Sequence, residues 1–386
     1  MGRLPASVST PHSLADLVEL QRGYDLTAAE RMPGQIPVIG GGGPNGTHDT
    51  ANVSGPGVVV VRSGSGFGNV WWVNEDFWAH NTVMFAKSFK GNHKKFAYYV
   101  LDWLDFTSYN SGGAQPSLNR NFIYAIPVFL PSPPEQARIA GIIETWDCAI
   151  ETVEALIANV RAQKQALMQQ LLTGKRRLPG FDLPWKERAL ESIFQFKKGQ
   201  GLSKGAVIPE GVRPCILYGE LYTRYPEVIR EVVSRTNAND GFPSKSGDVL
   251  IPASTTTTGI DLANATAILE SDVLLSGDIN ILRPKNTKQS APFFAYLLTH
   301  ILKHKIASRA QGITIVHLYG AHLKPLTVTV PDVEEQHAIA SIIMDADDEI
   351  LRLEAQLTAL RQEKAALMQQ LLTGKRRVKL PESEVA

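Results

Sequence analysis

Three short segments of this 386-residue chain combine glycine with small hydroxyl and amide side chains. They are residues 40–48 (GGGGPNGTH), 63–69 (SGSGFGN) and 254–258 (STTTT). Bare backbone N–H groups, hydroxyls and amides of this kind can hydrogen-bond phosphate oxygens and the edges of nucleic-acid bases. Glycine also supplies positive φ in ordinary turns between strands, so both interpretations stay open for each segment.

Two further polar segments, residues 115–120 (QPSLNR) and 309–314 (RAQGIT), bring Arg, Gln, Asn and hydroxyl groups close together. Such side chains pair with guanine, adenine or phosphate, although a polar surface loop explains either segment nearly as well. The basic pair at 197–198 is equally consistent with solvated surface charge. The candidate DNA-contacting residues are Arg22, Asn45, Arg62, Ser63, Ser65, Asn69, Ser117, Asn119, Arg120, Lys197, Lys198, Ser254, Thr255, Thr256, Arg309, Gln311 and Thr314.

Motifs for catalysis or metal binding are missing from the sequence. It has no Gly-x-x-x-x-Gly-Lys-Ser/Thr phosphate loop, no Asn-Pro-Pro-aromatic methyltransferase motif, no Cys-x-x-Cys and no His-Glu-x-x-His. The glycines at 64, 66 and 68 precede an expected strand, which argues against a dinucleotide site. His300 and His304 lie one helical turn apart, but the sequence supplies no third ligand or base beside them. We therefore expect no catalytic residue, metal or cofactor in this chain.

An internal repeat at an offset of 200 residues organises the chain. Residues 131–177 and 331–377 are identical at 25 of 47 positions. A fainter repeat links 13–23 with 189–199 at an offset of 176, and the offset has grown to 196 by residue 74. The chain therefore consists of two globular units, each followed by one copy of the strong repeat. Because the repeated segments have been preserved and the globular units have diverged, we expect like roles for the segments and unlike roles for the units.

Each copy of the strong repeat has the pattern of a long amphipathic helix, with apolar residues in alternating steps of four and three. Lys164 and Lys364 interrupt this heptad seam at equivalent places, and a polar seam residue can fix helix register. A proline and a Glu-Gln pair open each copy, and Gly174 or Gly374 followed by Lys-Arg-Arg ends it. The expected helix–helix seam consists of Ile139, Ile143, Ile150, Val153, Ile157, Val160, Leu167, Leu171, Ile339, Ile343, Ile350, Leu353, Leu357, Leu360, Leu367 and Leu371.

A helix over residues 134–172 would be roughly 58 Å long at ~1.5 Å per residue, which exceeds the diameter of one small domain. We therefore expect the two helices to pair, while two helices that each pack on their own domain remain the alternative. Only residues 178–185, with Pro179 and Pro184 among them, join the first helix to the second unit. This short connection predicts an antiparallel coiled-coil rod with one unit at each end and an approximate two-fold axis. Such a rod could act as a ruler along about one to one and a half turns of duplex DNA.

The globular units mix strand-sized apolar runs with one helix-sized segment each, which predicts an α+β fold with a mixed or antiparallel sheet. The expected strands are residues 57–62, 70–73, 83–86, 248–252 and 278–282, and the expected helices are 94–104 and 292–306. The predicted division is a first recognition-sized domain at 1–130, a spacer helix at 131–177, a second domain at 178–330, a second spacer helix at 331–377 and a tail at 378–386.

Composition excludes several classes of protein. The net charge of +1 does not argue for a free-standing nucleic-acid binder, so any DNA binding would be local or shared with a more basic partner. Two cysteines are too few for a disulfide framework. The sequence shows no signal-peptide pattern and no apolar run of membrane-spanning length. We therefore expect a soluble cytoplasmic protein that does not contact membranes.

The repeated segment resembles the helices of type I restriction–modification specificity subunits. The resemblance rests on the Pro-x-x-x-Glu-Gln start, the Ile-Ala-x-Ile-Ile pattern and the Leu-Leu-Thr-Gly-Lys-Arg-Arg end, each present twice. Residues 115–120, which lead into Ile126-Pro-Val128, look like the end of a target recognition domain of that family. The resemblance covers nearly the whole chain. The second unit departs from it, because it has Gly312-Ile-Thr-Ile in place of the Pro-Ser-Leu-Asn motif of the first unit.

The resemblance implies that each unit is a target recognition domain for one half of an asymmetric bipartite site in double-stranded DNA. It also implies that the helices set the unread gap and dock two modification subunits, which supply the S-adenosylmethionine chemistry on adenine. Restriction (translocase) subunits that use ATP and Mg²⁺ would join them, and this chain would not be catalytic. The main alternative is a coiled-coil scaffold that binds protein partners. A DNA-acting enzyme with an unrecognised site, such as a nuclease, is a weaker one.

Overall fold

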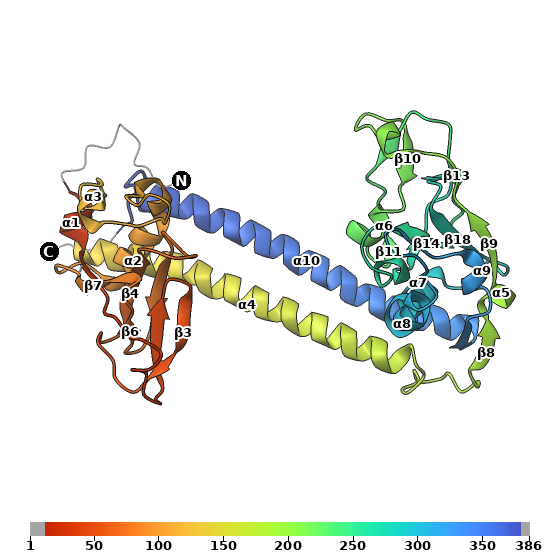
Figure 1. Ribbon diagram of the computed structural model, residues 1–386, viewed down its shortest axis with the longest axis horizontal. Coiled ribbons are helices and arrows are strands. Elements are labelled where there is room, and N and C mark those ends of the chain that lie inside the picture. The colour runs from red at the N-terminus through yellow and green to blue at the C-terminus, as the bar shows by residue number, and fades with distance from the viewer. Residues whose placement is uncertain (1–11, 380–386) are drawn as a thin grey trace. The chain divides into compact units, whose positions relative to one another are not determined.

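The computed structural model describes residues 12–379, so residues 1–11 of the predicted first domain and 380–386 of the predicted tail lie outside the described residues. The chain forms two compact units. Unit 1 comprises the residues up to 155 together with those from 355 onward, and unit 2 comprises residues 156–354. Two 39-residue helices, α4 (Pro133–Leu171) and α10 (Val333–Leu371), contribute to both units (Figure 1).

Unit 1 is built around an antiparallel sheet of strand order β1-β7-β4-β5. Its central strand β4 reads Gly-Val-Val-Val-Val and is buried throughout, because structure covers both of its faces. A second sheet has the order β3-β2-β6 and includes a parallel pair. The elements are α1 (Leu14–Leu17), β1 (Glu19–Arg22), β2 (Ile36–Gly40), β3 (Gly43–His48), β4 (Gly57–Val61), β5 (Val70–Val73), β6 (Trp78–Ala79), β7 (Val83–Ser88), α2 (Lys94–Trp103), the 3₁₀-helix η1 (Phe106–Tyr109) and α3 (Arg120–Ile123).

Unit 2 repeats the same core, since β9, β18 and β14 pair in the order in which β1, β7 and β4 pair in unit 1. Its main sheet has the order β11-β16-β14-β18-β9, and a further mixed sheet has the order β12-β10-β17-β13. The elements are β8 (Lys186–Ala189), α5 (Leu190–Ile193), β9 (Phe194–Lys198), η2 (Lys204–Ala206), β10 (Arg213–Ile216), α6 (Glu220–Thr223), β11 (Val228–Ile229), β12 (Arg235–Thr236), β13 (Phe242–Pro243), β14 (Asp248–Pro252), β15 (Ser254–Thr255), η3 (Asp261–Ala263), β16 (Thr266–Ile268), β17 (Leu274–Leu275), β18 (Ile279–Pro284), α7 (Ala291–Tyr296), the π-helical turn η4 (Leu297–Ile301), α8 (Lys303–Ala307), β19 (Val316–His317), α9 (Gly320–Leu323) and β20 (Thr327–Val330).

The predicted α+β class, with mixed sheets, is confirmed, and all five expected strands are present with ends shifted by at most two residues. Two local predictions are wrong. Residues 40–48 are not a loop but the turn and second strand of the β2–β3 hairpin, in which Gly43 and Gly46 take positive φ. The helix expected over 292–306 is interrupted by η4, where the Thr299 hydroxyl is hydrogen-bonded to both backbone groups of Ala265.

Helices α4 and α10 run antiparallel within each unit, as the sequence predicted. In unit 1, Lys364 pairs with Asp147 at 2.6 Å and Arg361 pairs with Glu154 at 2.6 Å, so the numbering rises along α4 as it falls along α10. In unit 2, Lys164 pairs with Asp347 at 2.6 Å. Each of the sixteen seam residues is buried or half-buried. No helix within residues 12–379 is both long and apolar enough to cross a membrane.

The ends of the helices complete the cores of the globular domains. The core of unit 1 includes Ile139 and Ile143 from the start of α4 and Leu371 from the end of α10. The core of unit 2 likewise includes Ile339 from the start of α10 and Leu171 from the end of α4. Each core therefore takes the start of one helix and the end of the other, which excludes the alternative in which each helix packs only on its own domain.

The two ends of the repeated segment bind each other across the helix pair. In unit 1, the guanidinium of Arg377 donates to both carboxylate oxygens of Glu135, at 2.8 and 2.6 Å. In unit 2, Arg177 does the same to Glu335, at 2.7 Å to each oxygen. The hydrogen bond from Arg377 lowers the pKa of the buried Glu135 carboxyl. The glutamate that opens each repeat and the last arginine that closes it are therefore ion-pair partners and not only helix-terminal charges.

Candidate nucleic-acid interface

In unit 1, the end of β4 meets the loop that precedes α3. The N–H of Leu118 donates to the carbonyl of Arg62 at 2.8 Å, Ser63 and Ser117 form a β-bridge, and Arg62 Nη2 lies 3.4 Å from Ser117 Oγ. Partial burial, and then the positive charge of nearby Arg22, lower the pKa of Arg62. Arg22 and Arg62 thus lie near enough to affect each other's charge, and two neighbouring cations favour an anionic partner such as a phosphate group.

The two glycine-rich segments of unit 1 pack against each other beside this bridge. The N–H of Gly66 donates to the carbonyl of Gly41 at 3.0 Å. A Cβ at position 41 would lie 2.5 Å from the carbonyl oxygen of Ser63, so this close approach requires glycine. Ser65 and Asn69 are exposed on the resulting surface. Arg22, Arg62, Ser63, Ser65, Asn69 and Ser117 thus come from three segments that converge at the ends of β1 and β4.

Three candidates in unit 1 have other or additional contacts. The Asn119 side chain caps α3 by accepting from the N–H of Asn121 at 3.0 Å. Arg120 Nη1 donates to the carbonyl of Leu20 at 2.7 Å and so ties α3 to β1. Asn45 is exposed in β3, and its backbone carbonyl accepts from Arg31 Nη1 at 2.6 Å. Asn119 and Arg120 therefore stabilise the loop that carries Ser117.

In unit 2, the corresponding surface is a shallow cleft of about 220 Å³. Lys197 and Lys198 from β9 and Lys324 after α9 supply three exposed cations, and the rings of His317 and Tyr319 stack at 5.9 Å along the cleft. The sequence predicted Lys197 and Lys198 but missed the other three. The signal that could have found them is the offset of 200, because His317 and Tyr319 occupy the places of Ser117 and Asn119.

The STTTT segment differs from its prediction. Ser254 and Thr255 are 4% and 1% exposed and form the short strand β15, which pairs with β19. The Ser254 hydroxyl donates to Asp278 at 3.1 Å, and Thr255 shares a hydrogen bond with Thr257. The structure therefore does not place these two side chains on the exposed surface, and Ser254 instead binds Asp278, which lines the cleft. The remaining candidates, Thr256, Arg309, Gln311 and Thr314, are exposed.

The same backbone framework thus carries different side chains in the two units. The β-bridge between 63 and 117 in unit 1 corresponds to the pairing of 254 with 317 in unit 2, and α3 corresponds to α9 at an offset of 200. On this framework Arg22 is replaced by Lys198, and Ser117 by His317. The framework is shared, while the groups that could contact a ligand are not.

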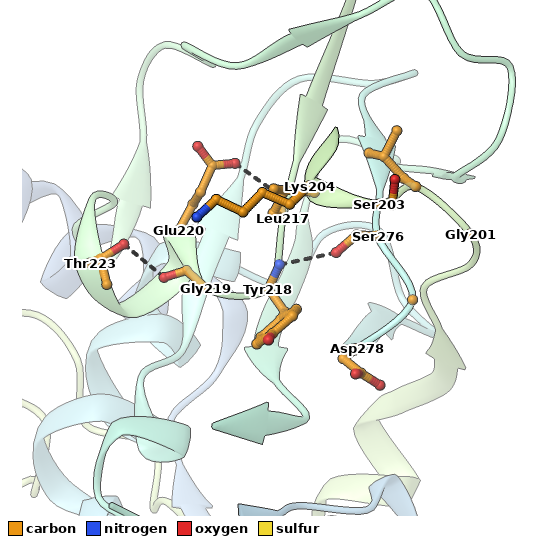
Figure 2. Close-up of a pocket in the computed structure, with 12 residues that line it drawn as sticks. Gly201, Ser203, Lys204, Leu217, Tyr218, Gly219, Glu220, Thr223, Ser276 and Asp278 are labelled. Carbon is orange, nitrogen blue, oxygen red and sulfur yellow. Dashed lines mark hydrogen bonds between the residues drawn. The ribbon is translucent and has the colours of Figure 1, made fainter. Parts of the chain in front are cut away.

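A larger pocket of about 470 Å³ adjoins the cleft of unit 2 (Figure 2). It lies in the stretch where the second repeat is longer, and Asp278 lines both the pocket and the cleft. Glu220 at its edge is already engaged, because it accepts from the N–H of Leu217 at 2.9 Å and from the Ser234 hydroxyl at 2.6 Å. Tyr218 and Lys204 line the pocket with an aromatic and a cationic side chain (Figure 2).

Comparison with known proteins identifies the family. The family model of type I restriction modification DNA specificity domains matches residues 9–162 and again residues 183–360. The chain belongs to this family. A predicted type I restriction enzyme specificity subunit of Haemophilus influenzae is 23% identical over 319 residues, which cover 81% of this chain and 80% of that relative. A type I restriction enzyme specificity subunit of Methanocaldococcus jannaschii is 20% identical over 340 residues, which cover 83% of this chain and 79% of that relative.

The fold is that of solved specificity subunits. The crystal structure of the type I restriction–modification S subunit of M. genitalium superposes with a TM-score of 0.65 at 19% identity, and the match covers 98% of this chain and 99% of that one. The chain is therefore a type I specificity subunit with two recognition domains, and the scaffold alternative is not supported.

The two units of this specificity chain also share a polar network at the helix pair. In unit 1 the Tyr99 hydroxyl donates to Asp147 at 2.6 Å, and Lys364 binds the other oxygen of the same carboxylate. In unit 2, Tyr296 and Lys164 bind Asp347 in the same way. Burial and the hydrogen bond to aspartate raise the pKa of both tyrosines, which therefore stay neutral donors. The lysines that interrupt the seam are thus paired across it.

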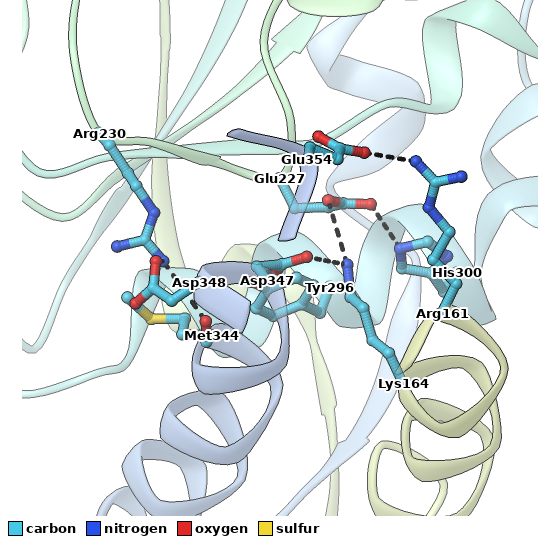
Figure 3. A network of polar contacts seen from close by, with 10 residues as sticks. All are labelled: Arg161, Lys164, Glu227, Arg230, Tyr296, His300, Met344, Asp347, Asp348 and Glu354. Carbon is cyan, nitrogen blue, oxygen red and sulfur yellow. Dashed lines mark hydrogen bonds and ion pairs between the residues drawn. The ribbon is translucent and has the colours of Figure 1, made fainter. Parts of the chain in front are cut away.

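In unit 2, two further side chains, Glu227 and His300, extend this network (Figure 3). Glu227 lies 2.6 Å from Nε2 of His300 and 3.9 Å from Nζ of Lys164, so the expectation that no base lies beside His300 is wrong. Burial alone would raise the pKa of Glu227, but the His300 hydrogen bond and the Lys164 charge lower it to about 2. Within residues 12–379, no three His, Cys, Asp or Glu side chains are grouped so that they could hold a metal ion.

Proposed function

We propose that this chain reads DNA sequence for a type I restriction–modification complex and carries out no reaction itself. Unit 1 reads one half of an asymmetric bipartite site and unit 2 reads the other. The two helices set the unread gap and dock two modification subunits. S-adenosylmethionine, ATP and Mg²⁺ act in the modification and restriction subunits, and this chain binds none of them.

One observation carries this proposal: a shared framework presents unlike contact groups. If both units recognised one common partner, their surfaces would have been preserved in the way that the helices have, at 25 identities in 47 positions. Instead, unit 1 presents Arg22, Arg62 and Ser117, whereas unit 2 presents Lys198 and His317 at the corresponding places. Different base sequences require different hydrogen-bonding groups on one frame.

The side chains fit DNA chemistry. Arginine pairs bidentately with guanine or phosphate, and serine and asparagine reach base edges or phosphate oxygens. The cations form local clusters in a chain whose net charge is +1, so the affinity for DNA depends on partner subunits that add positive surface. The repeated helices provide the same docking surface twice, which fits two copies of a modification subunit.

The test is an exchange of recognition domains. The full complex is produced with residues 1–130 replaced by those of a divergent relative, and methylated adenines are mapped in the DNA of the host cells. We expect one half of the methylated sequence to change while the other half and the gap remain. The matched control replaces residues 178–330 and should change the opposite half only. A change in both halves from a single exchange would refute the assignment of one half-site to each unit.

The non-catalytic part of the proposal has its own test. The purified chain is incubated alone with unmodified duplex DNA, Mg²⁺ and S-adenosylmethionine, and cleavage and methylation are measured. We expect neither product, whereas the complex with its modification subunits should methylate the same DNA. Cleavage by the chain alone, at a rate that follows its concentration through purification, would favour the enzyme alternative.

A further inference from the structure

The loop that joins α8 to β19 in unit 2 presents an apolar side chain at its tip. Gln311 and His317 close the loop with two backbone hydrogen bonds of 2.8 and 2.7 Å. Gly312 has a φ of +128°, and Ile313 next to it is 99% exposed. Ile315 in the same loop is 48% exposed. An isoleucine in full contact with water contributes nothing to the folded core.

Unit 1 shows that this turn does not need an isoleucine. The loop at an offset of 200 has Gly112 and Gly113 at the positions of Gly312 and Ile313. A Cβ on Gly112 would lie 2.1 Å from the carbonyl oxygen of Gln115, and a Cβ on Gly312 would lie 2.0 Å from that of Ile315. Both loops therefore bring this glycine equally close to the backbone three residues on, and only unit 2 places a large apolar group beside it.

We propose that Ile313 contacts the C5-methyl group of a thymine and so specifies a T·A pair in the half-site of unit 2. This inference rests on the proposed function. In the major groove the thymine methyl is the apolar feature among the base edges, and apolar side chains recognise it, whereas the minor groove displays no methyl group. The exposed Gln311 and Thr314 beside Ile313 can hydrogen-bond neighbouring bases or phosphates.

A thymine contact fits the chain better than a protein contact does. The two copies of the helix have kept the same residues at 25 of 47 positions, as expected for a surface with one role in both units. A modification subunit that docked on this loop in each unit would likewise need the same residue at positions 113 and 313. Position 313 instead differs from its counterpart at position 113, as do His317 and Ser117 on the same loop. The tip therefore varies together with the contact surface of its unit.

The experiment uses the full complex of this chain with its modification subunits, after adenine-methylation mapping has given the half-site of unit 2. Each thymine of that half-site is replaced in turn by deoxyuridine, which lacks only the methyl group, and Kd is measured. For wild type we expect one position at which the replacement weakens binding about fourfold, the factor for burial of one methylene-sized group. The matched variant is Ile313→Gly, which has the sequence of unit 1 at this position.

For Ile313→Gly we expect the thymine duplex to bind as weakly as the wild type binds the deoxyuridine duplex, with no further loss on replacement. Sensitivity of the variant equal to that of the wild type would overturn the inference, as would a half-site without a T·A pair. If Ile313→Gly weakened association with the modification subunit and left base discrimination intact, the loop would be a protein contact. Failure of the wild-type complex to prefer its mapped site over random DNA would instead overturn the proposed function.

Discussion

The Glu227 network makes the stability of unit 2 depend on pH. The Glu227 side chain is only 17% exposed, and His300 and Lys164 hold it as a carboxylate. We predict that Glu227→Gln lowers the free energy of unfolding of unit 2. Glutamine keeps the shape of the protonated acid and can still hydrogen-bond His300, but it loses the electrostatic attraction between the carboxylate and Lys164.

The magnitude follows from the pKa. A fall from 4.5 in the unfolded chain to about 2 in the folded one stabilises unit 2 by about 3 kcal/mol, at ~1.4 kcal/mol per pKa unit. Because the folded pKa is the lower one, this stabilisation is fully present above pH 4.5 and is lost as the pH falls toward 2. The variant should therefore be about 3 kcal/mol less stable than wild type at pH 7 and only about 1 kcal/mol less stable at pH 3.

The assay is native-state amide hydrogen exchange of the full chain at several denaturant concentrations, because it reports on each unit separately. Amides of β16 and α7 report on unit 2, and amides of β4 and α2 report on unit 1. The matched control is Glu144→Gln in unit 1, whose partner Lys95 lies 3.6 Å away in a surface pair with a glutamate 53% exposed. That change should stay within about 0.5 kcal/mol at every pH. A loss in Glu227→Gln that did not shrink between pH 7 and pH 3 would refute the reasoning.

Three further predictions concern the helix ends, the basic cleft and the length of the helices. In thermal unfolding, Gly374→Ala should destabilise unit 1 by more than Gly174→Ala destabilises unit 2. Both glycines have a left-handed backbone, but the new Cβ at 374 would lie 2.7 Å from the Phe129 ring, whereas the new Cβ at 174 would lie 3.4 Å from the Trp185 ring. Equal losses of stability would contradict this prediction. Removing Lys197 and Lys198 together by alanine substitution should reduce the slope of log K against log salt for DNA binding by about two, and an unchanged slope would exclude phosphate contacts. Deleting seven residues from each helix, about 10.5 Å at ~1.5 Å per residue, should shorten the recognised gap by about three base pairs at ~3.4 Å each, whereas an unchanged gap would disprove the ruler.

The sequence by itself determined the repeat, the two long helices and their antiparallel pairing. Helical periodicity is a local property of the chain, so the steps of four and three along 134–172 were enough to predict α4. The direction of α10 followed from connectivity, because 178–185 is too short to carry the chain back along α4. Strands such as β5 and β14 were predicted to the residue, since each is a short apolar run between turn residues.

Only the tertiary structure decided which polar side chains are exposed and free to contact a ligand, and which are buried and stabilise the fold. Glu135 and Arg377 are 242 residues apart, and no local pattern indicates that one neutralises the other inside unit 1. Ser254 and Thr255 have the composition of an exposed loop, yet pairing with β19 buries them. His317 and Tyr319 belong to no recognisable motif in the sequence. They become part of a basic cleft because the fold brings β9 and α9 together. Burial and partner choice depend on segments distant in the chain, so local periodicity carries no information about them.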